Sequence, residues 1–147
     1  MKAIADTGFL VAFLNSQDQH HAWAEELAAQ VSEPLLTCES VLTEAAYLLN
    51  NVPLVLEVLA SGLVELSFSL EDNRAHVTEL AARYSDRQPD LCDLCVVRMS
   101  ELYPGHQVIT TDRKDFRVYR RNKREAIPIL APPEKCTSPR RRTATTK

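Results

Sequence analysis

Short apolar runs alternate with amphipathic segments along most of the chain. The runs predict buried strands, and apolar stripes at three- and four-residue spacing predict helices. Trp23, Leu27 and Val31 recur at four-residue spacing, which indicates a helix that Asp18 can cap. Residues 64–68 instead alternate apolar with polar positions. That second pattern is typical of a half-exposed edge strand.

The complete series of expected elements alternates strands with helices. We expect strands at 3–5, 35–37, 64–68, 108–109 and 127–130, and helices at 9–14, 18–31, 38 or 40 to 49, 53–60, 70–84 and 90–102. This order favours an α/β fold of three layers, in which helices flank a mostly parallel central sheet of four to five strands. Residues 1–131 are expected to form this domain, and 132–147 a basic, disordered C-terminal tail.

Composition narrows the class of protein. The chain has 147 residues, of which 45% are apolar and 25% charged, as expected for one globular domain. Its longest uncharged apolar run, 7–15, is far shorter than the ~18–20 residues that a membrane-spanning helix needs. The residues before that run do not suit a signal peptide. We therefore expect a cytoplasmic protein with no membrane partner.

Charge is divided unevenly along the chain. Residues 1–112 carry 5 Lys or Arg and 17 Asp or Glu, whereas residues 113–147 carry 12 and 3. An acidic body followed by a basic segment suits a protein that holds cations in one place and a polyanion beside it. A soluble acidic domain with a basic tail would give the same division, so charge alone leaves both interpretations open.

Four acidic residues lie at positions where a carboxylate is expected to bind a ligand, a metal ion or an opposite charge. Asp6 and Asp112 each follow a predicted strand, and open parallel sheets bind ligands at the carboxyl ends of their strands. Glu44 and Asp93 share helix faces with apolar residues, where an unpaired charge is costly. Each has an ordinary interpretation as a helix cap, a stripe edge or a turn residue, and Asp93 as a capping-box partner of Asp90. All four ordinary interpretations together would be a coincidence.

Two of the four cysteines, Cys92 and Cys95, form a CxxC pair. A zinc site would need a second such pair or two histidines at ligand spacing, and neither is present in the sequence. We therefore interpret both residues as buried helix cysteines rather than as a metal or redox centre.

Four segments together resemble the PIN-domain ribonucleases, specifically the VapC-type toxins of bacterial toxin–antitoxin pairs. The segments are 4–10, 42–49, 90–97 and 108–116, and they follow the family's order within residues 2–130. The sequence Thr-Thr-Asp-Arg-Lys-Asp-Phe within the last segment is quite specific. Leu94 departs from the family pattern, which has a small residue after the helical aspartate.

The resemblance implies a site and a reaction. It implies that Asp6, Glu44, Asp93 and Asp112 are the catalytic and metal-binding residues. Among these we expect Asp6 and Asp93 to be the direct ligands. Supporting roles would fall to Thr7, Asp90, Thr110 and Asp115. Carboxylate ligands favour Mg²⁺ or Mn²⁺ over zinc. The implied activity is hydrolysis of RNA by metal-activated water, leaving a 5′-phosphate and a 3′-hydroxyl.

The resemblance also implies partners. RNA would be the substrate, a cognate antitoxin the inhibitor, and a second copy of the chain would complete a homodimer. A basic run begins beside Asp112 and is expected to bind RNA phosphates. Its members are Arg113, Lys114, Arg117, Arg120 and Arg121. The alternative interpretation of this run is a solvated surface.

Other strand-end acidic folds fit less well. A receiver-type signalling domain would need paired acidic residues after the first strand, where Asp6 stands alone. A phosphatase of the HAD type would need a second aspartate two residues after Asp6, and that position is Gly8. A non-catalytic PIN-like module that binds RNA or a partner remains the alternative function.

Overall fold

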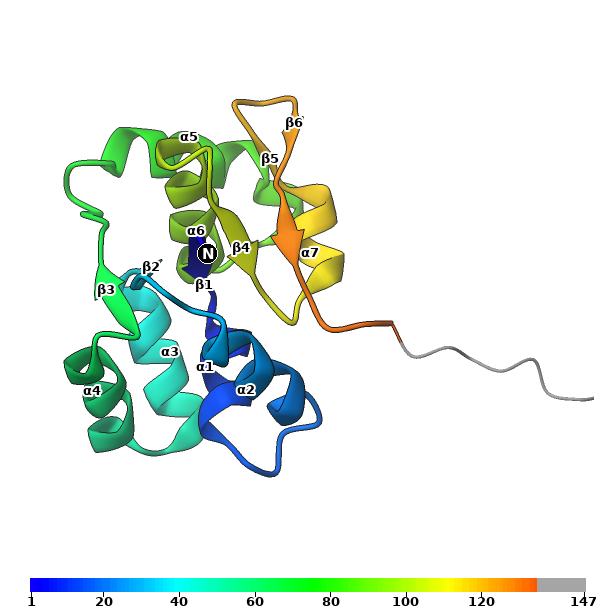
Figure 1. The fold of residues 1–147 in the computed structure, drawn as a ribbon. Coiled ribbons are helices and arrows are strands. Elements are labelled where there is room, and N and C mark those ends of the chain that lie inside the picture. Colours follow the sequence, from blue (N-terminus) through cyan, green and yellow to red (C-terminus); the bar gives the residue numbers. More distant parts are fainter. Residues whose placement is uncertain (135–147) are drawn as a thin grey trace, which may run out of the picture.

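A five-stranded parallel sheet forms the centre of the molecule in the computed structural model, which describes residues 1–134 (Figure 1). The strands are β1 (Ala3–Ala5), β2 (Leu35–Thr37), β3 (Val64–Leu66), β4 (Gln107–Ile109) and β7 (Ile129–Leu130). Their order across the sheet is β3-β2-β1-β4-β7, and every neighbouring pair is parallel. The α/β fold class expected from the sequence is confirmed.

Helices supply the crossover connections that parallel strands require. They are α1 (Thr7–Leu14), α2 (His21–Ala29), α3 (Glu39–Leu49), α4 (Val52–Ser61), α5 (Arg74–Arg83), α6 (Leu91–Leu102) and α7 (Arg113–Val118), with a short 3₁₀ turn, η1 (Ser85–Arg87). Helix α3 packs against α1, α4 and α6, and α5 packs against α6. The contact between α3 and α6 brings together two segments that lie far apart in the sequence.

Strand β1 lies at the centre of the hydrophobic core. All three of its residues are buried, as are Phe9 and Leu10 in α1, Val96 in α6 and Phe116 in α7. A strand covered on both faces has little freedom to shift its register, because any slip would expose apolar side chains. The residue that follows β1, Asp6, is therefore held in one place.

The structure differs from the expected elements mainly near the C-terminus. Helix α7 and the antiparallel hairpin of β5 (Arg120–Arg121) and β6 (Glu125–Ala126) were not predicted, because this segment is dominated by charged residues without an apolar period. The hairpin turn spans residues 122–124, and its first two residues, Asn122 and Lys123, have positive φ angles of 49° and 70°. The expected strand at 127–130 begins only at Ile129, and the expected strand at 64–68 ends at Leu66.

Cys92 and Cys95 are buried, as expected, and so is Cys38. Cys136 and all but the first three residues of the expected tail lie outside the described residues. Within residues 1–134, no helix is both long enough and apolar enough to cross a membrane.

Gly8 marks a close approach between α1 and the loop that follows β4. A Cβ at Gly8 would overlap the Thr111 hydroxyl and would lie 3.1 Å from Thr111 Cβ and 3.2 Å from its backbone nitrogen. Rotating the Thr111 side chain relieves only part of this overlap, since the backbone is also too close. We expect Gly8→Ala to lower the free energy of unfolding by about 1–3 kcal/mol, measured by urea denaturation.

Gly105→Ala is the matched control, because a Cβ there has no neighbour within 4 Å. Its free energy of unfolding should match that of the wild type. Combining Gly8→Ala with Thr111→Ala should recover part of the lost stability. Strictly additive losses in the double variant would contradict the proposed overlap.

Candidate active site

The carboxyl ends of β1 and β4 meet where the strand order changes direction. From β1 the chain builds β2 and β3 on one side of the sheet, and it places β4 and β7 on the other. The crevice at such a point is where open α/β sheets bind ligands. Asp6 directly follows β1, and Asp112 lies just beyond β4. Two of the predicted site residues therefore come from neighbouring strand ends.

Thr110 connects these two strand ends. Its hydroxyl donates a hydrogen bond to Asp6 Oδ2 over 2.8 Å and accepts one from the Asp112 backbone N–H over 2.9 Å. The Asp6 backbone N–H donates to the carbonyl oxygen of Ile109 over 3.0 Å. Thr110, which was expected to support the site, thus orients one carboxylate and fixes the loop that carries another.

Asp6 is buried, and within residues 1–134 no Lys, Arg or His lies within ion-pair distance of it. Burial raises the pKa of its carboxyl to about 6, although the hydrogen bond from Thr110 opposes that change. The carboxylates of Glu44 and Asp112 raise the pKa further, so both lie within electrostatic reach of Asp6. The structure therefore brings three of the four predicted acidic residues to one place.

Asp93 joins the same group through α6. Asp90 caps this helix by accepting the Asp93 backbone N–H at Oδ1 over 2.7 Å. The Asp93 carboxylate accepts a hydrogen bond from the Tyr119 hydroxyl over 3.3 Å. Burial, followed by the carboxylates of Asp90, Asp6 and Asp112, raises the pKa of Asp93 to about 8. A capping box has two hydrogen bonds, and one of them, from the Asp93 backbone N–H to the Asp90 carboxylate, is present. The reciprocal bond, from the Asp90 backbone N–H to the Asp93 carboxylate, is not found within residues 1–134.

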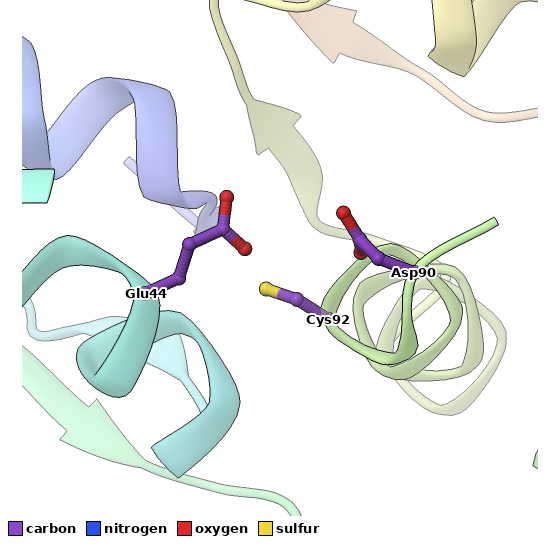
Figure 2. A group of neighbouring side chains, drawn as sticks. All are labelled: Glu44, Asp90 and Cys92. Carbon is purple, nitrogen blue, oxygen red and sulfur yellow. The ribbon is translucent and has the colours of Figure 1, made fainter. Parts of the chain in front are cut away.

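The side chains of Glu44, Asp90 and Cys92 point toward one another (Figure 2). One ligand atom from each lies within 4.8 Å of the other two, and Glu44 comes from α3 while the others come from the start of α6. Asp90 was expected only in a supporting role, and Cys92 was expected only to be buried. The sequence did not predict this contact, because the contact depends on how α3 packs against α6.

Cys92 shares its surroundings with the acidic residues. Burial raises the pKa of its thiol, and the carboxylates of Asp6 and Glu44 raise that pKa further. Its sulfur lies 3.5 Å from Thr7 Oγ1, so Thr7, another expected supporting residue, borders the same space.

A cavity of about 280 Å³ opens beside Asp93. It is lined by Arg87, Gln88, Pro89, Asp90, Asp93, Asp115, Val118 and Tyr119. Tyr119 is held there by edge-to-face contacts with Tyr84 and Phe116, whose ring centroids lie 5.1 and 5.7 Å away. Neither Tyr119 nor Arg87 was predicted. Arg87 had a signal, since it is one of only 5 basic residues in the acidic stretch 1–112, but Tyr119 had none.

The basic run divides into two parts. Arg113, Lys114 and Arg117 belong to α7, directly after Asp112. Lys114 is exposed, and Arg117 pairs with Glu134 over 2.9 Å. Arg113 is half-buried, and its guanidinium donates to the carbonyl oxygen of Pro132 over 2.7 Å.

Arg121 has a different environment. It is buried, and its guanidinium donates to the carbonyl oxygens of Ser100 and Pro104 and to the Glu125 carboxylate. Arg120 likewise donates to backbone carbonyl oxygens, those of Arg117 and Tyr119. These contacts hold the β5–β6 hairpin in place, so we do not include Arg120 and Arg121 in the proposed RNA surface.

The acidic group fits a divalent cation. Within residues 1–134, no Lys, Arg or His lies within ion-pair distance of its five carboxylates. These belong to Asp6, Glu44, Asp90, Asp93 and Asp112. Carboxylates gathered without counter-charges repel one another, and a cation is the ordinary way for a protein to offset that repulsion.

Most of the sequence matches a known protein family. The sequence profile of the PIN domain family matches residues 3–122. The chain belongs to the PIN domain family. The resemblance inferred from the four sequence segments is therefore confirmed.

Two relatives come from Mycobacterium tuberculosis. Ribonuclease VapC26 (strain ATCC 25618 / H37Rv) is 24% identical over 123 aligned residues, and the match covers 80% of this chain and 91% of that protein. The crystal structure of VapC20, described as a toxin that cleaves the sarcin–ricin loop, matches with a TM-score of 0.61 at 22% identity. That match covers 74% of this chain and 87% of the VapC20 chain, and it supports the fold.

Burial of the carboxylates, together with repulsion among them, should make the metal-free PIN domain less stable as pH rises. Asp93 has a pKa of about 8 in the fold and an ordinary value of 3.8, so between these values the folded state holds a proton that the unfolded state has lost. The free energy of unfolding therefore falls from about pH 4 to pH 8. Asp6 adds a smaller fall between about pH 4 and pH 6.

Asp93→Asn should flatten this pH dependence, because it removes one charge and retains the shape. At pH 8 in EDTA we expect the variant to be more stable than the wild type by about 1–2 kcal/mol, a figure reduced for the partial exposure of the carboxylate. Thermal unfolding at pH 5 and pH 8 measures the effect. Asp72→Asn, at an exposed position, should change neither value. An Asp93→Asn protein that is less stable at both pH values would contradict the assignment to the acidic group.

Proposed function

We propose that this PIN domain is a Mg²⁺- or Mn²⁺-dependent endoribonuclease that acts as the toxin of a toxin–antitoxin pair. The observation that carries the proposal is the convergence of carboxylates from separate segments at the carboxyl ends of β1 and β4, with no cationic partner within residues 1–134. The family, and the names of the VapC relatives, favour RNA as the substrate.

The cation would be held by the acidic residues. Asp6 and Asp93 are the proposed direct ligands, Glu44 and Asp112 complete the set, and Asp90 joins it because its carboxylate lies beside Glu44. Oxygen donors suit Mg²⁺ and Mn²⁺. When bound, such an ion polarises a phosphodiester and lowers the pKa of a water molecule beside it.

The chain's own residues prepare the site for this chemistry. Thr110 orients Asp6, and Tyr119 orients Asp93 through their hydroxyl groups. The cavity beside Asp93 offers space for part of a nucleotide, and Arg87 on its wall offers a positive charge for a phosphate. Attack by water would leave a 5′-phosphate and a 3′-hydroxyl on the cleaved RNA.

Cleavage of total cellular RNA tests the proposal. With Mg²⁺ or Mn²⁺ the wild type should cut RNA, and EDTA should stop it. Asp6→Asn and Asp93→Asn should each lower the rate at least ~100-fold, because each removes a charged ligand and keeps its shape. Asp72→Asn is the matched control and should cut at the wild-type rate. Because the proposed reaction leaves a 5′-phosphate on the downstream RNA fragment, an exonuclease that requires a 5′-phosphate should degrade that fragment.

Two results would contradict the ribonuclease function. Cleavage that persists in both Asn variants would show that the activity does not come from the acidic group. Binding of RNA without cleavage in either metal ion would instead favour the alternative, a non-catalytic PIN-like binding module. In cells, expression of the wild type should arrest growth, and expression of Asp93→Asn should not.

The exposed cations of α7 are the proposed RNA-binding surface. Lys114→Ala should weaken RNA binding and make its salt dependence shallower by about one unit of log–log slope, since one phosphate contact is lost. Lys2→Ala removes an exposed charge just before the amino end of β1, the end opposite Asp6, and should change neither quantity. Filter binding at several salt concentrations measures both.

Arg121→Ala should behave differently from Lys114→Ala. It removes the donors to the carbonyl oxygens of Ser100 and Pro104 and leaves these groups without their partner, so we expect a loss of about 2–4 kcal/mol in stability. This division of the basic residues would be contradicted if RNA binding became less salt-dependent in a folded Arg121→Ala protein but kept the wild-type salt dependence in Lys114→Ala.

A cognate antitoxin and a homodimer are part of the same proposal. They rest on the likeness to VapC toxins. A small gene directly upstream, encoding a protein with a DNA-binding N-terminus, would identify the antitoxin. Co-expression of that protein should relieve growth arrest, and sedimentation of the purified toxin would give its oligomeric state.

A further inference from the structure

A thiol stands inside the carboxylate group. Cys92 Sγ and one carboxylate oxygen each from Glu44 and Asp90 lie within 4.8 Å of one another, and Figure 2 shows the three side chains directed into the same space. The described residues can therefore coordinate a metal ion through sulfur as well as through oxygen. A soft sulfur donor shares this space with two hard oxygen donors.

Three donors of these types suit a zinc-like ion better than magnesium. Zn²⁺ binds cysteine sulfur at ~2.3 Å and carboxylate oxygen at ~2.0–2.2 Å, usually with four tetrahedral positions. Donors around such an ion lie roughly 3.3–3.7 Å apart, so the three side chains need to approach by only about 1 Å. Mg²⁺ takes oxygen ligands and gains nothing from the sulfur.

The surroundings leave all three donors available. Asp90 uses Oδ1 to cap α6, so its second oxygen is not engaged in that bond. Glu44 has no Lys, Arg or His within ion-pair distance in residues 1–134. Cys92 is only 6% exposed, and its sulfur contacts the Thr7 hydroxyl at 3.5 Å, a weak interaction that a metal ion can replace. Packing thus holds a shielded thiol against two carboxylates.

We propose that Glu44, Asp90 and Cys92 form a binding site for a divalent cation that accepts sulfur ligands, and that this cation is Zn²⁺. Occupation of this site engages Glu44 and Asp90, which the proposed function assigns to Mg²⁺ or Mn²⁺. Zinc binding therefore inhibits the ribonuclease. The inhibition rests on the proposed function, whereas the binding of the ion does not.

Cobalt(II) absorption tests the binding directly. Co²⁺ added to the metal-free, full-length protein should produce a sulfur-to-cobalt charge-transfer band in the near ultraviolet, and Zn²⁺ should abolish it by displacing the cobalt. Cys92→Ser should lack the band. The matched control is Cys95→Ser, whose thiol is also buried in α6 but lies beside Ser40, 3.8 Å away. Cys95→Ser and Cys136→Ser should both retain the band.

A wild type without the band, or a Cys92→Ser protein that keeps it, would overturn the site. If Cys92→Ser fails to fold, as judged by circular dichroism, Glu44→Gln serves instead. It keeps every thiol and should weaken Co²⁺ binding at least ~10-fold. Unchanged Co²⁺ affinity in Glu44→Gln would equally overturn the proposed set of ligands.

Cleavage assays separate this inference from the proposed function. Addition of Zn²⁺ at concentrations well below that of Mg²⁺ should suppress RNA cleavage by the wild type. Cleavage that Zn²⁺ leaves unchanged, in a protein that shows the cobalt band, would overturn the inhibitory part. A cobalt band without any cleavage in Mg²⁺ or Mn²⁺ would preserve the site and refute the ribonuclease function. Cleavage in a protein without the cobalt band would refute the thiol-containing site and preserve the ribonuclease function.

Discussion

The hydrogen bonds of Thr110 are the constraint on which the site depends. This hydroxyl donates to the Asp6 carboxylate at the end of β1 and accepts the backbone N–H of Asp112 beyond β4. Because β1 is buried on both faces, neither strand end can shift without disturbing the core. The position of the acidic group is thereby determined by the central packing of the sheet, and not by the flexible ends of its side chains.

That packing holds together groups that repel one another. The pKa of Asp6 is raised to about 6 and that of Asp93 to about 8, chiefly by burial and then by neighbouring carboxylates. A fold that holds such a group without a cation loses stability, which the apolar core must offset. The same repulsion favours binding of a cation, so the strain in the metal-free protein is a direct consequence of the proposed function.

The first turn of α6 serves several purposes at once. Asp90 caps the helix and faces Glu44, Cys92 places a thiol beside both, and Asp93 extends toward Tyr119. Successive residues at a helix start point in different directions, and here each direction meets a different neighbour. Hard and soft donors consequently lie next to one another, and the two proposals for metal ions at this site follow from that arrangement.

The sequence by itself determined the α/β class and the placement of Asp6 and Asp112 at strand ends, because buried strands and amphipathic helices leave a local hydrophobic pattern. It also singled out Glu44 and Asp93, since charges on apolar helix faces break that pattern. Only the tertiary structure placed Cys92 and Asp90 beside Glu44, buried Arg121 and directed Tyr119 toward Asp93. These contacts join segments far apart in the chain, and a local pattern reports whether a side chain is buried but not which distant side chain it meets.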